Sequence, residues 1–208
     1  MQGVGVDMAG VEIGVDGAEL ERVFKALKKY PKSAEKALIR TVNDTAQRTV
    51  APLKTEITAK YNIKKKDLSG GNAYKSENSN NLIKVKKVNN LQQNAKIEVR
   101  GSSLTLQRFV KGEKTPSHIR RKNVVVQVKK GNAATLNNRT FLQYAHGSIQ
   151  VMSRRSGERH ISRLLKTTST AQMASNDEVS KAVQEKSQEV LKKRADHYIE
   201  LELKKIKG

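Results

Sequence analysis

The alternation of apolar and polar residues near the start of the chain predicts a short strand followed by a helix. In residues 11–15, VEIGV, apolar side chains fall on every second position, which places them on one face of a strand. Asp16 and Gly17 follow as a turn, and residues 18–30, AELERVFKALKKY, carry apolar side chains at helical spacing. Pro31 cannot continue a regular helix, so we expect the first helix to end there.

A second, longer helix is predicted to begin with Ser33 as its N-cap. Its apolar and small side chains recur at helical spacing and form one continuous stripe. The positions of the stripe are Leu38, Val42, Ala46, Val50, Leu53, Ile57 and Tyr61. Pro52 falls inside the stripe. We expect it to kink the helix or to divide it in two, because proline removes a backbone donor and clashes with the preceding turn.

After Asp67 the pattern changes to a polar loop and then to a block of strands. Residues 69–81 are rich in glycine, serine and asparagine, which is typical of a loop. Runs of strand length follow at residues 82–88, 95–101, 104–110 and 123–131. The first two runs suit a hairpin whose register stays open. Residues 140–153 predict a further pair of strands around Gly147.

From about Asn176 onward the sequence predicts one helix of some 30 residues, with a narrow apolar stripe among charges. Such a stripe is typical of a helix that packs against one neighbour. The order of elements predicts an α+β fold, with N-terminal helices packed on an antiparallel β-sheet and a long C-terminal helix. We expect a flexible N-terminal arm, an α+β core domain, and a C-terminal helix packing on the core or on a neighbouring subunit. These parts span residues 1–10, 11–175 and 176–208.

The composition of the 208 residues indicates a protein that depends on partners. Hydrophobic residues make up 36% and aromatic residues 4%, so part of the chain is expected to pack on another subunit. The absence of cysteine excludes disulfides and thiol nucleophiles and fits folding in a reducing cytoplasm. No apolar run approaches the roughly 20 residues that span a membrane. We therefore expect no membrane partner, and the first residues do not have the pattern of a signal peptide.

Charge is distributed unevenly along the chain. The net charge is +21, yet residues 1–20 hold four acids and no Lys or Arg. Residues 21–175 hold 33 basic and nine acidic residues, an excess of +24. Such an excess indicates a polyanion or a strongly acidic protein as a partner.

Nothing in the sequence predicts catalysis. The four histidines do not have the short pair spacing of a zinc site, and no pair of carboxylates suggests general acid–base chemistry. The glycines near the N-terminus precede a strand rather than a helix, which argues against a phosphate-binding loop. We therefore expect no enzyme, no cofactor and no metal.

Basic clusters are the remaining candidates for function. The interaction candidates are Tyr61, Ile63, Lys64, Lys65, Lys66, Arg120, Arg121, Lys122, Arg154 and Arg155. Recognition of single strands would require aromatic side chains interleaved with these charges, and few are present. The sequence therefore favours a basic surface that faces solvent or a protein partner. The alternative of a non-specific nucleic-acid-binding protein stays open.

A series of residues resembles the phage minor tail protein Z family. The series comprises Ala37-Leu38, Asn43, Thr45, Ala46, EITAKYNIKKKDL at residues 56–68, Gly101, Leu104, Leu106, Phe109, the VVVQVKKG run to Gly131, Phe141, Gly147, Val151 and Arg154. It covers roughly residues 18–205 in order. The stretch 160–170 departs from the family, which usually has a proline before its Ile-x-x-Leu element and then a Gly-Pro-Ser turn.

The resemblance implies a virion structural protein, a tail completion component at the neck, near the head-proximal end of a phage tail. It implies partners among the tail terminator, tail tube and head–tail connector, and assembly in the host cytoplasm. Tail symmetry suggests a homo-oligomeric ring, for which we expect a hexamer. Non-specific contact with passing DNA stays open as a secondary role.

The resemblance also places YNIKKK, residues 61–66, at the junction of a helix and a sheet, with Tyr61 and Ile63 packed inward. Lysines suit the partial negative charge at the end of a helix. Their ammonium groups would then be available to an acidic neighbour. We further expect the arm of residues 1–10 to be mobile in the free subunit and to order on the basic surface of an adjacent one.

Overall fold

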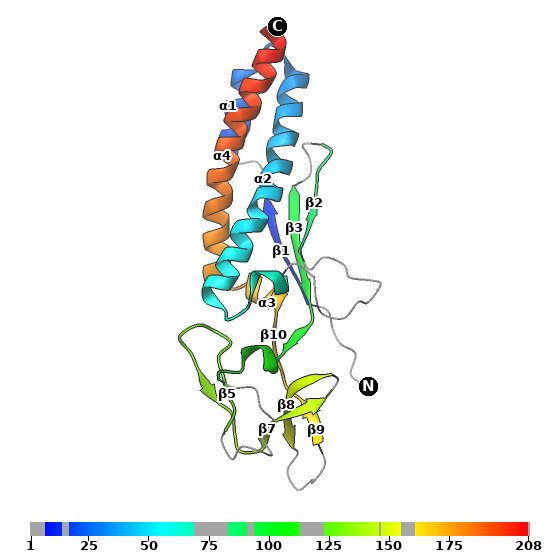
Figure 1. The fold of residues 1–208 in the computed structure, drawn as a ribbon. Coiled ribbons are helices and arrows are strands. Elements are labelled where there is room, and N and C mark those ends of the chain that lie inside the picture. Colours follow the sequence, from blue (N-terminus) through cyan, green and yellow to red (C-terminus); the bar gives the residue numbers. More distant parts are fainter. Residues whose placement is uncertain are drawn as a thin grey trace.

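The molecule is an elongated α+β protein with helices at one end and short strands at the other (Figure 1). The computed structural model describes residues 7–13, 17–68, 83–90, 94–112, 123–145, 147–154 and 161–207. The long helices are α1 (Gly17–Ala26), α2 (Pro31–Lys60) and α4 (Asp177–Lys207). The three α-helices, the short helix α3 (Thr170–Ala174) and one three-stranded sheet are called the helical half; the described residues of 103–169 are called the β lobe.

α2 begins three residues earlier than the sequence suggested and continues through its proline. Tyr30, rather than Ser33, occupies the N-cap position and makes no side-chain capping bond. Pro31 is the first helical residue, where its missing N–H has no partner to lose. The first helix ends at Ala26, before Pro31 is reached. Pro52 lies inside one undivided helix, so the expected division of α2 is wrong.

α2 and α4 pack side by side in opposite directions along the helical half. Apolar side chains from α1, α2 and α4 form a buried cluster near the free end, with Val23, Leu38 and Ile199 among its members. Four ion pairs also join α2 to α4. Taken in order along α2, they are Arg40–Glu202, Asp44–Arg194, Glu56–Lys186 and Lys60–Glu178. The long C-terminal helix expected from the sequence therefore packs on the chain's own second helix.

The sheet of the helical half has the order β1-β3-β2 and is antiparallel throughout. Its strands are β1 (Asp7–Ile13), β2 (Ile83–Lys86) and β3 (Ala95–Gly101). The register of β2 and β3, which the sequence left open, pairs Ile83 with Val99 and Val85 with Ile97. Ile97 and Val99 are buried in the largest core cluster, together with Leu53 and Ile57 of α2.

Residues 7–10 correct the expected boundary of the flexible arm. They form the first half of β1, in which Asp7 pairs with Gly101 and Gly10 with Glu98. The strand predicted from residues 11–15 therefore starts earlier than expected and ends at Ile13. The rest of the predicted arm, residues 1–6, lies outside the described residues.

The β lobe consists of short antiparallel pairs. Its strands are β4 (Ser103–Thr105), β5 (Val125–Val126), β6 (Ala134–Thr135), β7 (Thr140–Ala145), β8 (Ser148–Arg154), β9 (Ile161–Leu164) and β10 (Lys166–Ser169). The predicted hairpin around Gly147 is confirmed as β7 and β8. Gly147 has a φ of 76°, a conformation that favours glycine and allows the tight turn.

The run at residues 104–110 is not the strand that the sequence predicted. Only its start belongs to β4, and residues 106–109 form the 3₁₀ helix η2 (Leu106–Phe109). This turn sends the two large side chains to different cores. Leu106 packs in the small cluster of the β lobe, whereas Phe109 is fully buried in the main core of the helical half.

The chain enters and leaves the β lobe at neighbouring points. β4 follows β3 and pairs with β10, which leads directly into α3. The hydroxyl of Thr170 donates to the Arg100 carbonyl at 3.2 Å. A Cβ on Gly101 would lie 2.0 Å from the Thr170 Oγ1, so glycine permits this close approach. Residues 161–169, in the stretch that departs from the family pattern, form β9 and β10.

Candidate interaction surface at the junction of helix and sheet

The C-terminal end of α2 positions the first two predicted site residues in the core. Tyr61 leaves the helix with extended backbone angles while its N–H still donates to the Ile57 carbonyl at 2.8 Å. Tyr61 and Ile63 are 4% and 8% exposed and belong to the main core cluster. The prediction that both pack inward is confirmed. Neither side chain is therefore free to form the centre of an external contact.

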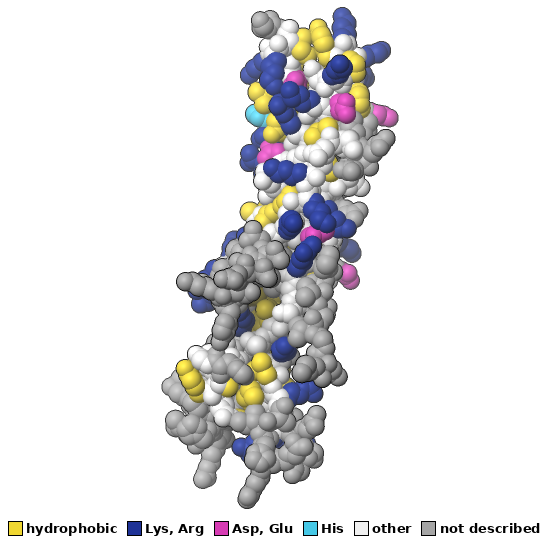
Figure 2. Space-filling model, turned by 90° about the vertical axis from the view of Figure 1, so that its right-hand side faces the viewer, with side chains coloured by type: hydrophobic (Ala, Val, Ile, Leu, Met, Phe, Trp, Pro, Cys, Tyr) yellow, Lys and Arg dark blue, Asp and Glu magenta, His cyan; other side chains and the backbone are white. Residues whose placement is uncertain are grey.

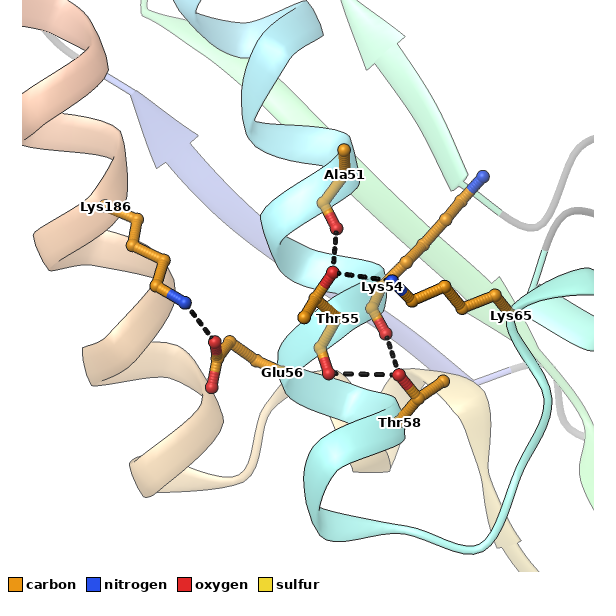
Figure 3. A network of polar contacts seen from close by, with 7 residues as sticks. All are labelled: Ala51, Lys54, Thr55, Glu56, Thr58, Lys65 and Lys186. Atoms are coloured by element: carbon orange, nitrogen blue, oxygen red, sulfur yellow. Dashed lines mark hydrogen bonds and ion pairs between the residues drawn. The ribbon is translucent and has the colours of Figure 1, made fainter.

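The three lysines that follow point to solvent. Lys64, Lys65 and Lys66 are exposed, and the last two begin the 3₁₀ helix η1 (Lys65–Leu68). The Lys65 ammonium folds back on α2 and donates to the Thr55 hydroxyl at 3.0 Å (Figure 3). The same view shows Lys186 of α4 paired with Glu56, one turn before the end of α2. In this view Lys65 lies on the side of α2 that faces away from α4.

A turn from the β lobe is tied to this junction by backbone hydrogen bonds. The Asn62 N–H donates to the Val128 carbonyl, and the Lys130 N–H donates to the Lys60 carbonyl, each at 2.9 Å. Gly131 has a φ of 86°, which the turn requires. The turn brings Lys130 next to the lysines that follow α2, although more than 60 residues separate them in the sequence.

These segments enclose a depression of about 370 Å³, which we call the junction pocket. Its lining residues are Asn62, Ile63, Lys64, Lys66, Asp67, Arg108 and Lys130. Arg108 comes from η2 and forms an ion pair with Asp67 at 3.2 Å. The pocket therefore holds four cationic side chains and one carboxylate. Four positive charges around a concave surface produce a local potential that attracts anions.

A second depression of about 420 Å³ has Tyr61 in its wall. It is lined by Tyr61, Val126, Val128, Lys129, Asn132, Ala134, Thr167 and Thr168. Burial raises the pKa of the Tyr61 hydroxyl, so the side chain stays neutral at physiological pH. This depression is more apolar than the junction pocket and has one cation, Lys129, in its wall.

Lys60, at the end of α2, forms an ion pair with Glu178 of α4 beside the junction. The hydrogen bond from the Lys60 ammonium lowers the pKa of the Glu178 carboxyl, which remains ionised at neutral pH. The last lysine of α2 is therefore compensated by α4. Lys64, Lys66 and Lys130, by contrast, have no carboxylate partner within the part of the chain that the structure describes.

The remaining predicted site residues do not join the junction pocket. Arg154 ends β8 in the β lobe and lies over the Phe141 ring, with its guanidinium carbon 4.9 Å from the ring centroid. Arg120, Arg121, Lys122 and Arg155 lie outside the described residues. Figure 2 shows that basic side chains are spread along this face of the molecule rather than gathered in one patch.

Sequence reasoning missed two of the four cations of the pocket. Lys130 belongs to a Lys-Lys pair, and its sequence context does not predict that it lies near the lysines after α2. Arg108 is isolated in the sequence, and only the turn of η2 brings it to Asp67. The role of Asn43 was also hidden. Its side-chain amide donates to the Val88 carbonyl and accepts from the Val88 N–H, both at 2.8 Å.

Two classes of site are not found among the described residues. No group of three or more His, Cys, Asp or Glu side chains there could hold a metal ion. Within those same ranges, no helix is long and apolar enough to cross a membrane. The described residues do form a cationic pocket where the helical half meets the β lobe, a place that we call the waist of the molecule.

Comparison with known proteins identifies one family. Residues 17–207 match the family described as prophage minor tail protein Z (GPZ). No curated protein sequence and no solved structure shows significant similarity to the chain. The match extends from the first helix to the end of α4, so it includes both the helical half and the β lobe.

Proposed function

The chain belongs to the prophage minor tail protein Z family, and from this premise we propose that it is a tail completion protein at the head-proximal end of a phage tail. Membership supports a structural role in a phage tail, as a virion component. The match over residues 17–207 is the observation that carries the proposal. The partners of the proposed neck position are the tail terminator, the tail tube and the head–tail connector.

The proposed assembly is a ring of identical subunits, with six copies set by tail symmetry. Closed cyclic assembly repeats one interface between neighbours. An elongated subunit that carries an uncompensated cationic pocket at its waist suits such an interface. In this proposal the subunit assembles in the host cytoplasm before it is incorporated into the virion.

The position can be tested by labelling virions. A prophage whose own gene is deleted would be complemented with this chain carrying an epitope tag after α4. We expect tagged protein in purified tails, with gold-labelled antibody at the head-proximal end. A chain that stays in the free protein fraction, or labels the distal tip of the tail, would contradict the proposal. Native mass spectrometry of the purified protein with its tail partners tests the copy number.

A second candidate is non-specific nucleic-acid binding, which the basic side chains of the junction pocket favour. Phosphate contacts release counterions, so the affinity for duplex DNA would fall steeply between about 50 mM and 200 mM salt. A filter-binding titration across this range measures the slope. If neither duplex nor single-stranded DNA is retained at low salt, this candidate function is rejected.

A further inference from the structure

We propose that the junction pocket binds carboxylates of the acidic N-terminal segment of a second copy of this chain. This inference rests on the proposed ring and adds the contact that joins neighbouring subunits. It gives the ring a heterologous interface, in which two different surfaces of the same protein meet. Such an interface closes into a ring when the rotation between neighbours allows it.

The first argument is that the pocket lacks internal compensation. Asp67 forms its ion pair with Arg108. The three lysines of the pocket have no carboxylate partner in the described parts of the chain. The surrounding sequence cannot supply one easily. Residues 103–169 contain 14 Lys or Arg and only two acids, both outside the described ranges. Since no carboxylate of the described residues compensates these three lysines, we look for the anion on another molecule.

The second argument is that the pocket is preformed. The backbone of Asn62 and of Lys130 is held by hydrogen bonds across the junction, and Arg108 is oriented by Asp67. The cations therefore come from three separate segments that are already fixed with respect to one another. A partner that inserts carboxylates into a preformed site loses less free energy to ordering than one that must assemble the site.

The third argument concerns the kind of anion. No exposed aromatic side chain lines the pocket, so nothing there can stack a nucleotide base. A concave site of about 370 Å³ accommodates a few side chains but not the outer surface of a duplex. Protein carboxylates fit these conditions better than nucleic acid.

The fourth argument identifies the partner. Residues 1–20 hold four acids and no Lys or Arg, which makes this segment complementary to the pocket. β1, in the middle of the segment, is an edge strand of its sheet. In Figure 1 the start of β1 lies at the same level along the molecule as the C-terminal end of α2. In a ring whose axis is parallel to the long axis of the subunit, two surfaces at one level meet between neighbours without a rise, so the ring can close.

The test reverses the charge of the pocket. Lys64→Glu with Lys66→Glu should weaken self-association at low salt by at least about tenfold, because attractive pairs become repulsive. Lys28→Glu with Lys29→Glu is the matched control, since these two lysines are exposed but lie in the turn after α1. Sedimentation velocity measures association, and circular dichroism checks that both variants melt like the parent chain. Equal association of pocket variant and control would overturn the proposal.

The identity of the partner is tested by a charge swap in trans. A chain with Asp7→Lys and Asp16→Lys should associate weakly alone, and should form mixed oligomers with the pocket variant. Should the Asp7→Lys change disturb β1, Asp16→Lys alone provides the same test. Failure of the mixture to associate would overturn the assignment of the N-terminal segment. If duplex DNA, added so that its phosphates equal the acidic groups of the second copy, displaces that copy, phosphate is the ligand. This result would also overturn the assignment of the N-terminal segment.

The outcomes separate this inference from the proposed function. If the chain is incorporated at the head-proximal end of the tail but its association does not depend on the pocket charge, the proposed function stands and the proposed contact is rejected. If the chain does not enter tails but the two charge-reversed variants still associate with each other, the proposed contact stands and the proposed tail role is rejected.

Discussion

The helical half and the β lobe are stabilised in different ways. In the helical half, two helices of 30 and 31 residues pack along their length around buried apolar side chains, and ion pairs cross between them. The β lobe has strands of two to seven residues around a cluster of five buried apolar side chains. Its described residues contain no Asp or Glu, so its cations form no ion pairs within the lobe.

The difference shows which half is self-sufficient. Ion pairs cross between the long helices of the helical half, and its core extends over most of its length. The β lobe has a small core, leaves Tyr144 66% exposed, and carries cations without any carboxylate among its own described residues. We therefore expect the helical half to determine the stability of the subunit, while the β lobe and the waist provide contacts with partners.

The largest expected effect tests whether the two halves unfold together. Phe109 comes from the β lobe but is fully buried in the core of the helical half. Phe109→Ala should reduce the free energy of unfolding by about 3–5 kcal/mol, because it removes the packing of a whole ring and leaves a cavity. Urea denaturation followed by circular dichroism measures the loss. Leu142→Ala, in the β-lobe core, is the comparison and should leave the helical transition nearly unchanged; equal losses would contradict the division into two halves.

A smaller effect is expected where the chain passes between the halves. Gly101→Ala places a Cβ against Thr170 and should cost about 1–3 kcal/mol through overpacking. Thr170→Ala removes the clashing hydroxyl, so the double variant should recover part of the loss. A double-mutant cycle from thermal melts measures this coupling. Independent, additive losses would show that the close approach at the waist does not restrain the structure.

The attachment of the sheet to α2 can be weakened within the helical half alone. Asn43→Ala leaves both backbone groups of Val88 without their partner and should cost about 1–3 kcal/mol. Asn43→Asp serves as the control. Its carboxylate keeps the acceptor for the Val88 N–H but cannot donate to the Val88 carbonyl. At neutral pH, where the carboxyl is ionised, the loss in the free energy of unfolding should therefore be smaller than in Asn43→Ala. Hydrogen exchange at the Val88 N–H should accelerate in Asn43→Ala and less in Asn43→Asp, which keeps its acceptor. An unchanged rate in Asn43→Ala would assign the attachment to other contacts.

The smallest expected effect is the acid sensitivity of the helical half. The hydrogen bond from Lys205, with Arg40 close by, lowers the pKa of the buried Glu202 carboxyl in the folded state. A carboxyl with a lowered pKa stabilises the fold above its unfolded pKa of roughly 4.3, and this contribution disappears as pH falls through the folded value. Glu202→Gln should therefore reduce the pH dependence of the melting temperature below about pH 4.5. A variant that keeps the full acid slope would exclude Glu202 as a source of it.

Local rules determined much of this protein from its sequence. The helical period predicted α2 and α4 to within a few residues, and alternation around Gly147 predicted the β7–β8 hairpin. These predictions succeed because periodicity and turn chemistry depend on residues that are near one another in the chain. The order of helices, strands and a final helix also gave the α+β class, and the series of motif residues gave the family.

Only the tertiary structure decided how distant segments combine. It made residues 7–10 a strand because β3 offers them an antiparallel edge, and it turned residues 106–109 into η2 so that Phe109 reaches the main core. It also brought Arg108 and Lys130 to the lysines that follow α2. Pairing between segments tens of residues apart has no local pattern, since it depends on which surfaces the core brings together. The sequence thus predicted half of the cations of the junction pocket, and the fold supplied the rest.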